Sequence, residues 1–277
     1  MTPMKTTLAA VLAPRKIIRI AEMQGGDTSS VWHVTLDGDE ALIAKSSPAP
    51  DAEARMLQAL SACGAPVPDV LHVTDHLLII SYIPNVSASE AGWRGFGTAL
   101  RKMHDVAQDA PYGWSDDYAI GRVTLPKAQS HDWAAFWMRE RLCPLANALP
   151  PHLQRQFQGM AALMERHLPS HPKPALLHGD LWLGNVLFSD HGVSALIDPA
   201  CMIGDAHAEF AVLTLFSTPP QAFWDAYQID VTSLQPKFTI YQLWPALMHH
   251  RLFGNSYLGL VSNLLDRIAD HFNPACE

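Results

Sequence analysis

Cysteine is scarce and scattered in this sequence. Its four cysteines stand at positions 63, 143, 201 and 276, and no two of them form a Cys-x-x-Cys pair. A disulfide framework or a cysteine-based zinc site needs paired, closely spaced cysteines. The sequence therefore predicts reduced thiols, which suit the cytoplasm.

Long apolar runs are missing as well. No stretch approaches the roughly 18 consecutive apolar residues that a bilayer-spanning helix requires. Near the N-terminus, Lys5 and the short apolar stretch 8–13 only weakly imitate a signal peptide, and no cleavage pattern follows them. We therefore expect a cytoplasmic protein without a membrane partner.

The chain also has no excess of positive charge. Its 19 Lys and Arg residues are outnumbered by 27 Asp and Glu residues, which gives a formal net charge of -8. Nucleic acid is bound by basic surfaces, so this balance argues against such a partner. The 14 histidines lack the His-Glu-x-x-His spacing of zinc enzymes, and no Gly-x-x-x-x-Gly-Lys phosphate loop occurs.

What the sequence does contain is a change of pattern near residue 83. Residues 1–83 are rich in short β-prone runs and include the hairpin signal Asp37-Gly38-Asp39. Beyond Pro84 the apolar residues mostly recur at helical spacing. This predicts an α+β protein with a small antiparallel β-rich lobe at 1–83 and a mainly helical lobe at 84–277. The expected strands are 17–20, 31–36, 41–45, 70–74, 77–82, 175–177 and 193–197, and the expected helices are 51–60, 93–106, 133–142, 154–167, 208–215, 221–228 and 237–253.

The second lobe carries two acidic segments with a distinctive spacing. In His-Gly-Asp-Leu-Trp-Leu-Gly-Asn at 178–185, four residues separate Asp180 from Asn185, and Asp198 follows within Ile-Asp-Pro-Ala. Kinase-type phosphoryl transfer needs a carboxylate that accepts the proton of the attacking hydroxyl, and oxygen ligands for Mg²⁺. We predict that Asp180 is the general base and that Asn185 and Asp198 hold the Mg²⁺ of Mg-ATP.

The first lobe contains a matching set of residues. Lys45 lies near the end of a predicted strand, and Glu53 lies on the next predicted helix. In kinases such a lysine reaches the α- and β-phosphates of ATP, and the glutamate holds its ammonium group. Together with the acidic segments, this pair predicts a bilobal protein-kinase-like fold. The other expected ATP contacts are the turn with Gly25 and Gly26, over the phosphates, and the backbone near Ile80 and Tyr82, beside the adenine.

Two further residues have two possible roles each. Trp182 follows the predicted base by two residues, and it either walls the acceptor pocket or belongs to the core. His249 lies in a Trp- and Leu-rich helix, where it either contacts the acceptor or is a buried structural histidine.

These residues together resemble the fructosamine-3-kinase (ketosamine-3-kinase) family, which is related to aminoglycoside and choline phosphotransferases. The family's His-Gly-Asp-Leu-Trp-Ser-Gly-Asn segment is present with Leu183 in place of serine, and its Ile-Asp-Pro-Ala stands at 197–200. The resemblance extends over nearly the whole chain. Similar segments are Gly-Gly-Asp at 25–27, Leu-x-x-Met-His at 100–104, Asp-Trp-x-x-Phe at 132–136, Arg-Leu at 141–142, Leu-Phe at 215–216 and Leu-Phe-Gly-Asn-Ser-Tyr at 252–257.

The resemblance implies ATP-dependent phosphorylation of the C3 hydroxyl of a ketoamine, either a small molecule or a protein-linked adduct, which is a deglycation activity. The chain departs from the family pattern at 126–130, at Ala206-His207 and at Trp244-Pro245, and these departures bear on which acceptor it takes. Two alternatives stay open: a phosphotransferase acting on an aminoglycoside, choline or another amino alcohol, and a nucleotide-binding pseudokinase. The intact set of Lys, Glu, Asp, Asn and Asp argues against the pseudokinase.

Overall fold

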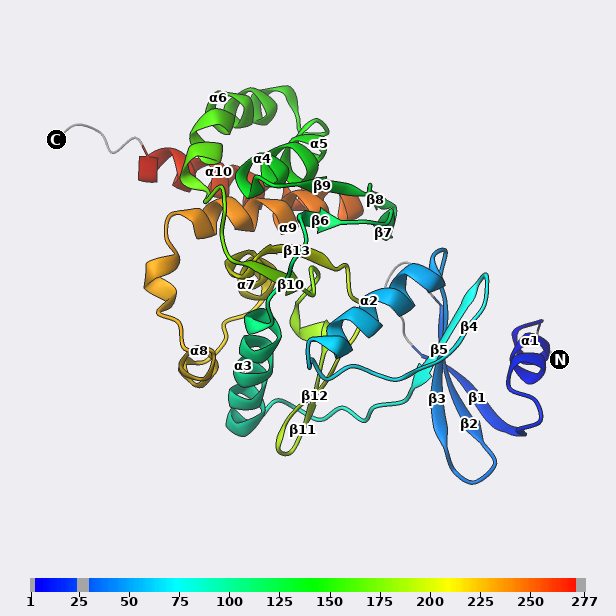
Figure 1. Ribbon diagram of the computed structural model, residues 1–277. Helices are drawn as coiled ribbons and strands as arrows, with labels where there is room; N and C mark the ends of the chain where they lie inside the picture. Colours follow the sequence, from blue (N-terminus) through cyan, green and yellow to red (C-terminus); the bar gives the residue numbers. More distant parts are fainter. Residues whose placement is uncertain (1–2, 24–29, 273–277) are drawn as a thin grey trace.

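The computed structural model describes residues 3–23 and 30–272. The N-terminal part is a five-stranded antiparallel sheet in the order β1-β2-β3-β5-β4, with one helix on each side of it (Figure 1). The predicted strands and the predicted helix of this part are all present. Its elements are α1 (Pro3–Val11), β1 (Ile17–Met23), β2 (Val31–Leu36), β3 (Ala41–Ser46), α2 (Pro50–Ala62), β4 (Val70–Val73) and β5 (Leu77–Ser81).

The two faces of this sheet are covered because side chains alternate along each strand. On β5, Leu77 and Ile79 pack with the group that contains Leu8 of α1, whereas Leu78 and Ile80 pack with α2. Over its first four residues, 77–80, the strand is therefore apolar and buried on both faces. The sequence pattern does not predict α1, since its short apolar stretch reads equally well as a lead-in to the first strand.

The hairpin between β2 and β3 confirms the turn expected from Asp37-Gly38-Asp39. Gly38 has φ +83° and Asp39 has φ +61°, so two of the three residues between Leu36 and Glu40 adopt left-handed backbone conformations. This geometry suits the twist of the flanking strands, and Asp and Gly are among the residues that adopt it most readily. The turn thereby sets the register that puts Lys45 of β3 opposite Val31 and Leu78.

After β5 the chain runs without helix or strand to Ser89, as expected of a linker. Asn85 accepts a hydrogen bond from the backbone of Phe188, and Val86 donates one to the Phe188 carbonyl, so the linker lies along the later β11–β12 hairpin. Ser89 then caps the N-terminus of α3 by accepting a hydrogen bond from the N–H of Gly92 at 3.0 Å.

The C-terminal part is mainly helical, with short strands that carry the chain between helices (Figure 1). The predicted α+β class is therefore confirmed. Its helices are α3 (Glu90–Asp105), α4 (Trp133–Phe136), the π-helical η1 (Trp137–Leu142), α5 (Cys143–Ala146), α6 (Pro151–His167), η2 (Leu183–Asn185), α7 (Ala206–Phe216), α8 (Gln221–Tyr227), η3 (Val231–Leu234), α9 (Lys237–Phe253), η4 (Asn255–Tyr257) and α10 (Leu258–Phe272). Its strands are β6 (Tyr112–Trp114), β7 (Tyr118–Ile120), β8 (Val123–Leu125), β9 (Ala128–Ser130), β10 (Pro174–Leu177), β11 (Val186–Ser189), β12 (Gly192–Leu196) and β13 (Met202–Asp205).

Several of these elements differ from the sequence-based expectation. The helix expected over 133–142 is split, because its second half winds as a π-helix. The short strands β6 to β9, the strand β13 and the last helix α10 were not expected. Strands of three or four residues are too short to show a period in the sequence, and they exist here because neighbouring strands pair with them.

A series of buried hydrogen bonds connects the helices of this part. The indole N–H of Trp133 donates to the hydroxyl of Tyr241 at 2.8 Å, and that hydroxyl donates to Asp205 at 2.8 Å. Lys237 also reaches Asp205, at 3.1 Å. The carboxylate at the start of α7 is thus paired and hydrogen-bonded, as a buried charge must be.

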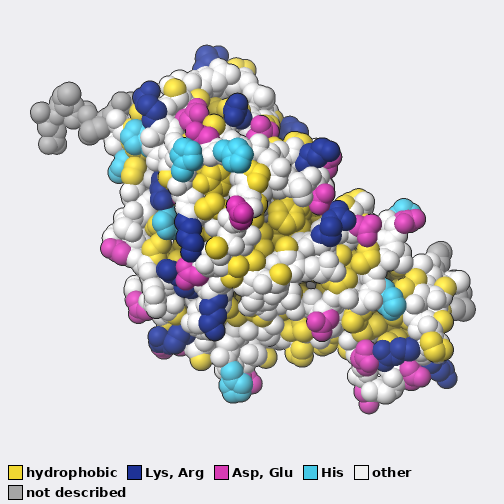
Figure 2. Space-filling view, in the orientation of Figure 1, with side chains coloured by type: hydrophobic (Ala, Val, Ile, Leu, Met, Phe, Trp, Pro, Cys, Tyr) yellow, Lys and Arg dark blue, Asp and Glu magenta, His cyan; other side chains and the backbone are white. Residues whose placement is uncertain are grey.

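The described part of the chain contains no helix with the length and apolar character needed to cross a membrane. On the face drawn in Figure 2, Lys and Arg side chains are interspersed with Asp and Glu and do not form one basic surface.

Replacing Phe96 by alanine tests the packing between α3 and its neighbours. Its fully buried ring contacts those of Trp93, Phe188 and Phe223. We expect Phe96→Ala to lower the free energy of unfolding by about 3–5 kcal/mol, measured by urea denaturation, because it leaves a cavity among three elements. Thr98→Ala, on the exposed side of the same helix, should change it by less than about 0.5 kcal/mol. Equal effects of the two substitutions would contradict this description of the core.

Candidate active site

The chain turns sharply after β10, at His178 and Gly179. Gly179 has φ +83°, and a Cβ at this position would lie 1.9 Å from the carbonyl oxygen of Ala200. Any other residue would collide with that backbone, so the turn requires glycine. The turn places Asp180 at the start of the loop that leads into η2 and Asn185.

Two backbone hydrogen bonds attach the second acidic segment to this loop. The N–H of Ala200 donates to the carbonyl of His178 at 2.8 Å, and that of Ile197 donates to Asn185 at 3.0 Å. Between them Asp198 has φ +55°, a left-handed conformation that costs a residue other than glycine about 1–2 kcal/mol. The surrounding bonds therefore hold Asp198 in a strained conformation, with its side chain 48% exposed.

Asn185 is buried beside Asp180. Its side-chain N–H donates to the backbone carbonyl of Asp180 at 2.8 Å and to the carboxylate at 3.4 Å. Among the described residues, nothing donates a hydrogen bond to its amide oxygen. That oxygen is consequently free to act as an acceptor or ligand. The structure thus brings Asp180, Asn185 and Asp198 together, as the sequence predicted.

Lys45 connects these acids to the N-terminal sheet. Its ammonium lies 2.9 Å from the carboxylate of Glu53 on α2 and 2.8 Å from that of Asp198. Both Lys45 and Glu53 are buried, so each charge depends on the other for compensation. The predicted Lys45–Glu53 ion pair is therefore present. Lys45 also forms an ion pair with Asp198.

The charges of this site shift one another's pKa values. Burial by itself would lower the pKa of Lys45, but the charges of Glu53 and Asp198 outweigh it, and the pKa is raised. Burial raises the pKa of Glu53, although the ammonium opposes that rise. Burial also raises the pKa of Asp180 to about 7, with Asp198 adding to the rise and the hydrogen bond from Asn185 opposing it. A carboxyl group with a pKa near neutrality is well matched to accepting and releasing a proton.

Glu209 anchors the loop, and the sequence analysis missed it. Its buried carboxylate accepts hydrogen bonds from the backbone N–H groups of His178 and Gly179, the latter at 3.1 Å. The ring nitrogen Nε2 of His104 lies 3.7 Å from the same carboxylate. A lone acidic residue in the otherwise apolar stretch 208–213 is the signal that could have pointed to this role.

His178 supports the loop from the other side. Its Nε2 lies 2.9 Å from the carbonyl oxygen of Ile197, so this nitrogen carries the proton and donates. Its Nδ1 then accepts from the N–H of Asp180, at 3.4 Å. Burial lowers the pKa of His178, which keeps the imidazole neutral in this tautomer. The histidine is therefore a support of the loop and is not a second base.

Tyr118 is a further neighbour that the sequence analysis did not identify. It lies on the β7–β8 hairpin, and burial raises its pKa, with added contributions from the carboxylates of Glu53, Asp198 and Asp180. The hydroxyl therefore stays protonated beside these acids. No element was predicted between residues 107 and 132, so nothing in the sequence indicated that this segment returns to the acids.

Trp182 and His249 occupy different surroundings. Trp182 is 45% exposed, and its ring lies so close to Gly184 that a Cβ there would be 2.2 Å from it. It is therefore not a core residue. His249 is half-buried, and its ring packs against Phe216, Phe253 and Tyr257. Within the described residues, no hydrogen bond or ring contact joins His249 to Trp182.

The tautomer of His249 follows from its contacts. Its Nδ1 lies 2.8 Å from the carbonyl oxygen of Pro245, so Nδ1 carries the proton and donates. Burial lowers the pKa of this ring, which leaves Nε2 unprotonated and able to accept a hydrogen bond.

The expected ATP contacts are less fully described. Gly25 and Gly26 lie outside the described residues. Ile80 lies within β5 with its side chain against α2, and Tyr82 lies directly after that strand. The ring of Tyr82 meets that of His33 edge to face at 4.6 Å, and its N–H donates to the carbonyl of Ala41. These contacts to ATP stay predictions.

Replacing Glu209 by glutamine tests the anchor of the loop. Glutamine keeps one acceptor oxygen but turns an N–H group toward a backbone N–H, so one buried donor loses its partner. We expect Glu209→Gln to lower the free energy of unfolding by about 1–3 kcal/mol in urea denaturation. Glu165→Gln, on the exposed face of α6, is the matched control and should change little. An unchanged stability of Glu209→Gln would contradict the assigned hydrogen bonds.

The raised pKa of Asp180 predicts a pH-dependent cost to stability. The folded protein holds this proton more tightly than the unfolded chain, so stability contributed by the group falls as pH rises from about 4 toward 7 and is lowest above it. Without nucleotide and with EDTA, Asp180→Asn should raise Tm by roughly 3 °C or more at pH 8, and by less at pH 5. Asp190→Asn, in the exposed β11–β12 turn, should leave Tm unchanged at both values. If Asp180→Asn raised Tm more at pH 5 than at pH 8, the raised pKa of Asp180 would be contradicted.

Comparison with known proteins places this geometry in a family. The model of the fructosamine kinase family matches residues 2–271. A probable ketoamine kinase of Thermus thermophilus is 33% identical over 246 residues, which are 86% of this chain and 89% of the relative. The sequence resemblance is thereby confirmed.

Solved structures share the fold. A Thermobifida fusca protein whose name places it among the fructosamine-3-kinases aligns with a TM-score of 0.81 and 27% identity, over 92% of this chain and 94% of that one. An aminoglycoside phosphotransferase in a ternary complex with ADP and hygromycin B aligns with a TM-score of 0.66 and 13% identity, over 94% and 95% of the two chains. The predicted kinase-like fold is confirmed by these matches. The chain belongs to the fructosamine kinase family.

Proposed function

We propose that this protein transfers the γ-phosphoryl group of ATP to the C3 hydroxyl of a ketoamine, a fructosamine or ribulosamine adduct. The observation that carries the proposal is the ion-paired set in which Lys45 bridges Glu53 and Asp198, next to Asp180 and Asn185. Membership of the fructosamine kinase family and the similarity to probable ketoamine kinases support the acceptor class.

Asp180 is the proposed general base. It would accept a hydrogen bond from the C3 hydroxyl, orient that oxygen in line with the γ-phosphate and take its proton as the new bond forms. The pKa near 7 supports this role, because the carboxyl is largely ionised just above neutrality and still a strong enough base. Glu209 and His178 would act as positioning residues, since they hold the loop and touch no reacting atom.

Lys45 and Glu53 are the proposed phosphate clamp. The ammonium of Lys45 would move from Asp198 to the phosphates when ATP binds, while Glu53 keeps it in place. The proposed N-terminal lobe, 1–83, would hold the nucleotide with the turn at Gly25 and Gly26 and with the backbone near Ile80 and Tyr82. The proposed lobe at 84–277 would hold the acceptor.

The oxygen atoms present fit a Mg²⁺ ion that arrives with ATP. Asp198 is 48% exposed, and within the described residues neither the amide oxygen of Asn185 nor the second carboxylate oxygen of Asp198 accepts a hydrogen bond. Among the described residues, no group of three or more His, Cys, Asp or Glu side chains could hold a metal by itself. Mg²⁺ commonly binds one or two protein oxygens plus phosphates and water, so Asn185 and Asp198 are the proposed ligands. When bound, the ion would neutralise charge on the phosphates.

Trp182 and His249 are the proposed acceptor contacts. The exposed indole of Trp182 stands two residues after the base and offers a flat apolar surface for a sugar ring. His249 presents an unprotonated Nε2 from a group of aromatic rings, which suits a hydroxyl or amine donor of the acceptor. We also propose a cytoplasmic location, in keeping with the reduced thiols described at Cys63, Cys143 and Cys201.

A panel of acceptors tests the proposal. ATP turnover is measured with fructosyl-, ribulosyl- and erythrulosyl-amines, with aminoglycosides and with choline. We expect turnover with at least one ketoamine and a drop in kcat of about 10²–10⁴-fold for Asp180→Ala, because the base is removed. Asp190→Ala, in the exposed β11–β12 turn, is the control and should keep full activity.

The other outcomes separate the alternatives. Turnover only with aminoglycosides or choline would replace the proposed acceptor class. Nucleotide binding without turnover of any acceptor would favour a pseudokinase. Unchanged turnover in Asp180→Ala would remove the proposed base.

A further inference from the structure

Arg141 is a buried arginine without a counter-ion. It lies in the π-helical η1 and is only 3% exposed. Within the described part of the chain, its single hydrogen bond runs from Nη1 to the carbonyl of Glu140 at 3.2 Å, and no carboxylate lies within ion-pair distance. Its guanidinium stands 4.7 Å from the ring centre of Phe136. Burial lowers its pKa to about 10, so it stays charged at neutral pH.

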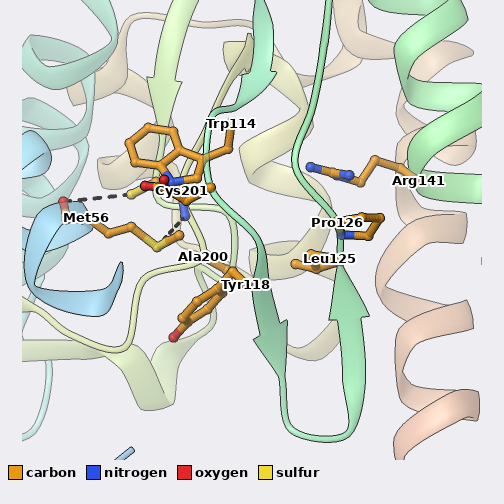
Figure 3. A pocket seen from close by; sticks show the side chains of 9 residues that line it. Met56, Trp114, Tyr118, Leu125, Pro126, Arg141, Ala200 and Cys201 are labelled. Atoms are coloured by element: carbon orange, nitrogen blue, oxygen red, sulfur yellow. Dashed lines mark hydrogen bonds between the residues drawn. The ribbon is translucent and has the colours of Figure 1, made fainter. Parts of the chain in front are cut away.

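The guanidinium points into a small pocket (Figure 3). The pocket has an accessible volume of about 10 Å³, which is room for one water molecule or one oxygen atom, and it is partly open. It is formed by α2, the β6–β9 segment, η1 and the residues that follow Asp198. Met56, Trp114, Tyr118, Arg141 and Cys201 are among its lining residues.

Two buried donors of this pocket have no acceptor. Nε of Arg141 and the indole Nε1 of Trp114 both make no hydrogen bond to the described residues. The one acid at the pocket, Asp116, is half-exposed and already lies 3.2 Å from Nε of Arg55. The pocket therefore offers a positive charge and N–H groups, and nothing in its described lining compensates them.

A water molecule would satisfy the donors but would leave the charge without a partner. A buried arginine is stabilised by an oxyanion, a carboxylate or a phosphate group, which can accept two of its N–H groups at once. A π-helical turn is rare and is frequently found at functional sites, which agrees with a binding role for this segment. These features are complementary to one class of ligand.

We propose that this pocket binds an oxyanion, a carboxylate or phosphate group, with Arg141 and Trp114 as its hydrogen-bond donors. One oxygen occupies the enclosed space, and the rest of the group lies toward the open side. The group belongs either to a free anion or to the acceptor molecule itself.

The pocket lies where α2 meets the segment that follows Asp198. Met56 follows Glu53 by three residues on α2, and Cys201 follows Asp198 by three residues. The N–H of Cys201 contacts the sulfur of Met56 at 3.3 Å, so α2 already meets the acidic segment here. An anion held between η1 and these residues would brace α2, with Glu53, against the segment that carries Asp198.

Thermal unfolding of the full chain tests binding without relying on activity. Tm is measured with and without about 20 mM inorganic phosphate, at constant ionic strength. We expect wild type to gain roughly 3 °C, and Trp114→Phe and Arg141→Met to gain less than half of that. Trp114→Phe removes only the N–H donor, so it decides the question even if Arg141→Met fails to fold.

Two matched controls account for phosphate bound elsewhere, for example near Lys45. Trp244→Phe changes another buried indole without a partner that does not line the pocket. Arg139→Met removes an exposed arginine from the same π-helix. Both controls should keep the full wild-type gain. An equal gain in wild type and Trp114→Phe would overturn the proposal, as would no gain in wild type together with an unchanged acceptor preference.

Kinetics then distinguish the source of the anion, and this arm alone rests on the proposed function. The kcat/KM of a fructosylated amino acid is compared with that of its carboxamide. If the acceptor supplies the anion, Trp114→Phe should reduce the preference for the carboxylate about tenfold. If a free anion binds, that preference stays the same while the phosphate effect on Tm remains. Absence of ketoamine turnover would leave the thermal result intact, so the two proposals fail separately.

Discussion

One ammonium group joins the two parts of this molecule. Lys45 comes from the N-terminal sheet, Glu53 from the helix that follows it, and Asp198 from a segment 153 residues later in the chain. Buried charges are tolerated only when they are paired, so the positions of β3, α2 and the acidic segment depend on one another. The same dependence would make the arrangement responsive to a ligand under the proposed function, because phosphates that attract Lys45 would release Asp198.

Residues beside this ion pair carry features that cost folding free energy, and neighbouring residues offset that cost. Asp198 has a left-handed backbone conformation, and the pKa of Asp180 is raised to about 7. Each of these features opposes folding. Glu209 compensates by accepting two backbone N–H groups, and His178 does so by bonding both Ile197 and the N–H of Asp180. Stability is given up at Asp180 and Asp198, and it is recovered at Glu209 and His178, which hold the backbone beneath them.

The sequence predicted the fold best where elements are long and regular. The strands of the N-terminal sheet are β-prone runs, helices such as α3 carry apolar residues at clear helical spacing, and the Asp-Gly-Asp turn specified its hairpin. The four short strands between 112 and 130 have no such period, because pairing with neighbouring strands alone makes them strands. The Arg141 pocket depends on them, since Trp114 and Tyr118 lie on β6 and β7. It was therefore not foreseeable from the pattern.

The sequence by itself determined the chemical groups of the site: Asp180, Asn185 and Asp198 at a kinase-type spacing, and Lys45 followed by Glu53. Residue type and spacing along one chain are enough to specify such a set, since each member lies in a local motif. Only the tertiary structure decided that Lys45 bridges both carboxylates, that Glu209 and His178 hold the loop, and that Arg141 has no carboxylate partner among the described residues. These relations join residues from separate elements, and both burial and pairing of charge depend on how those elements pack.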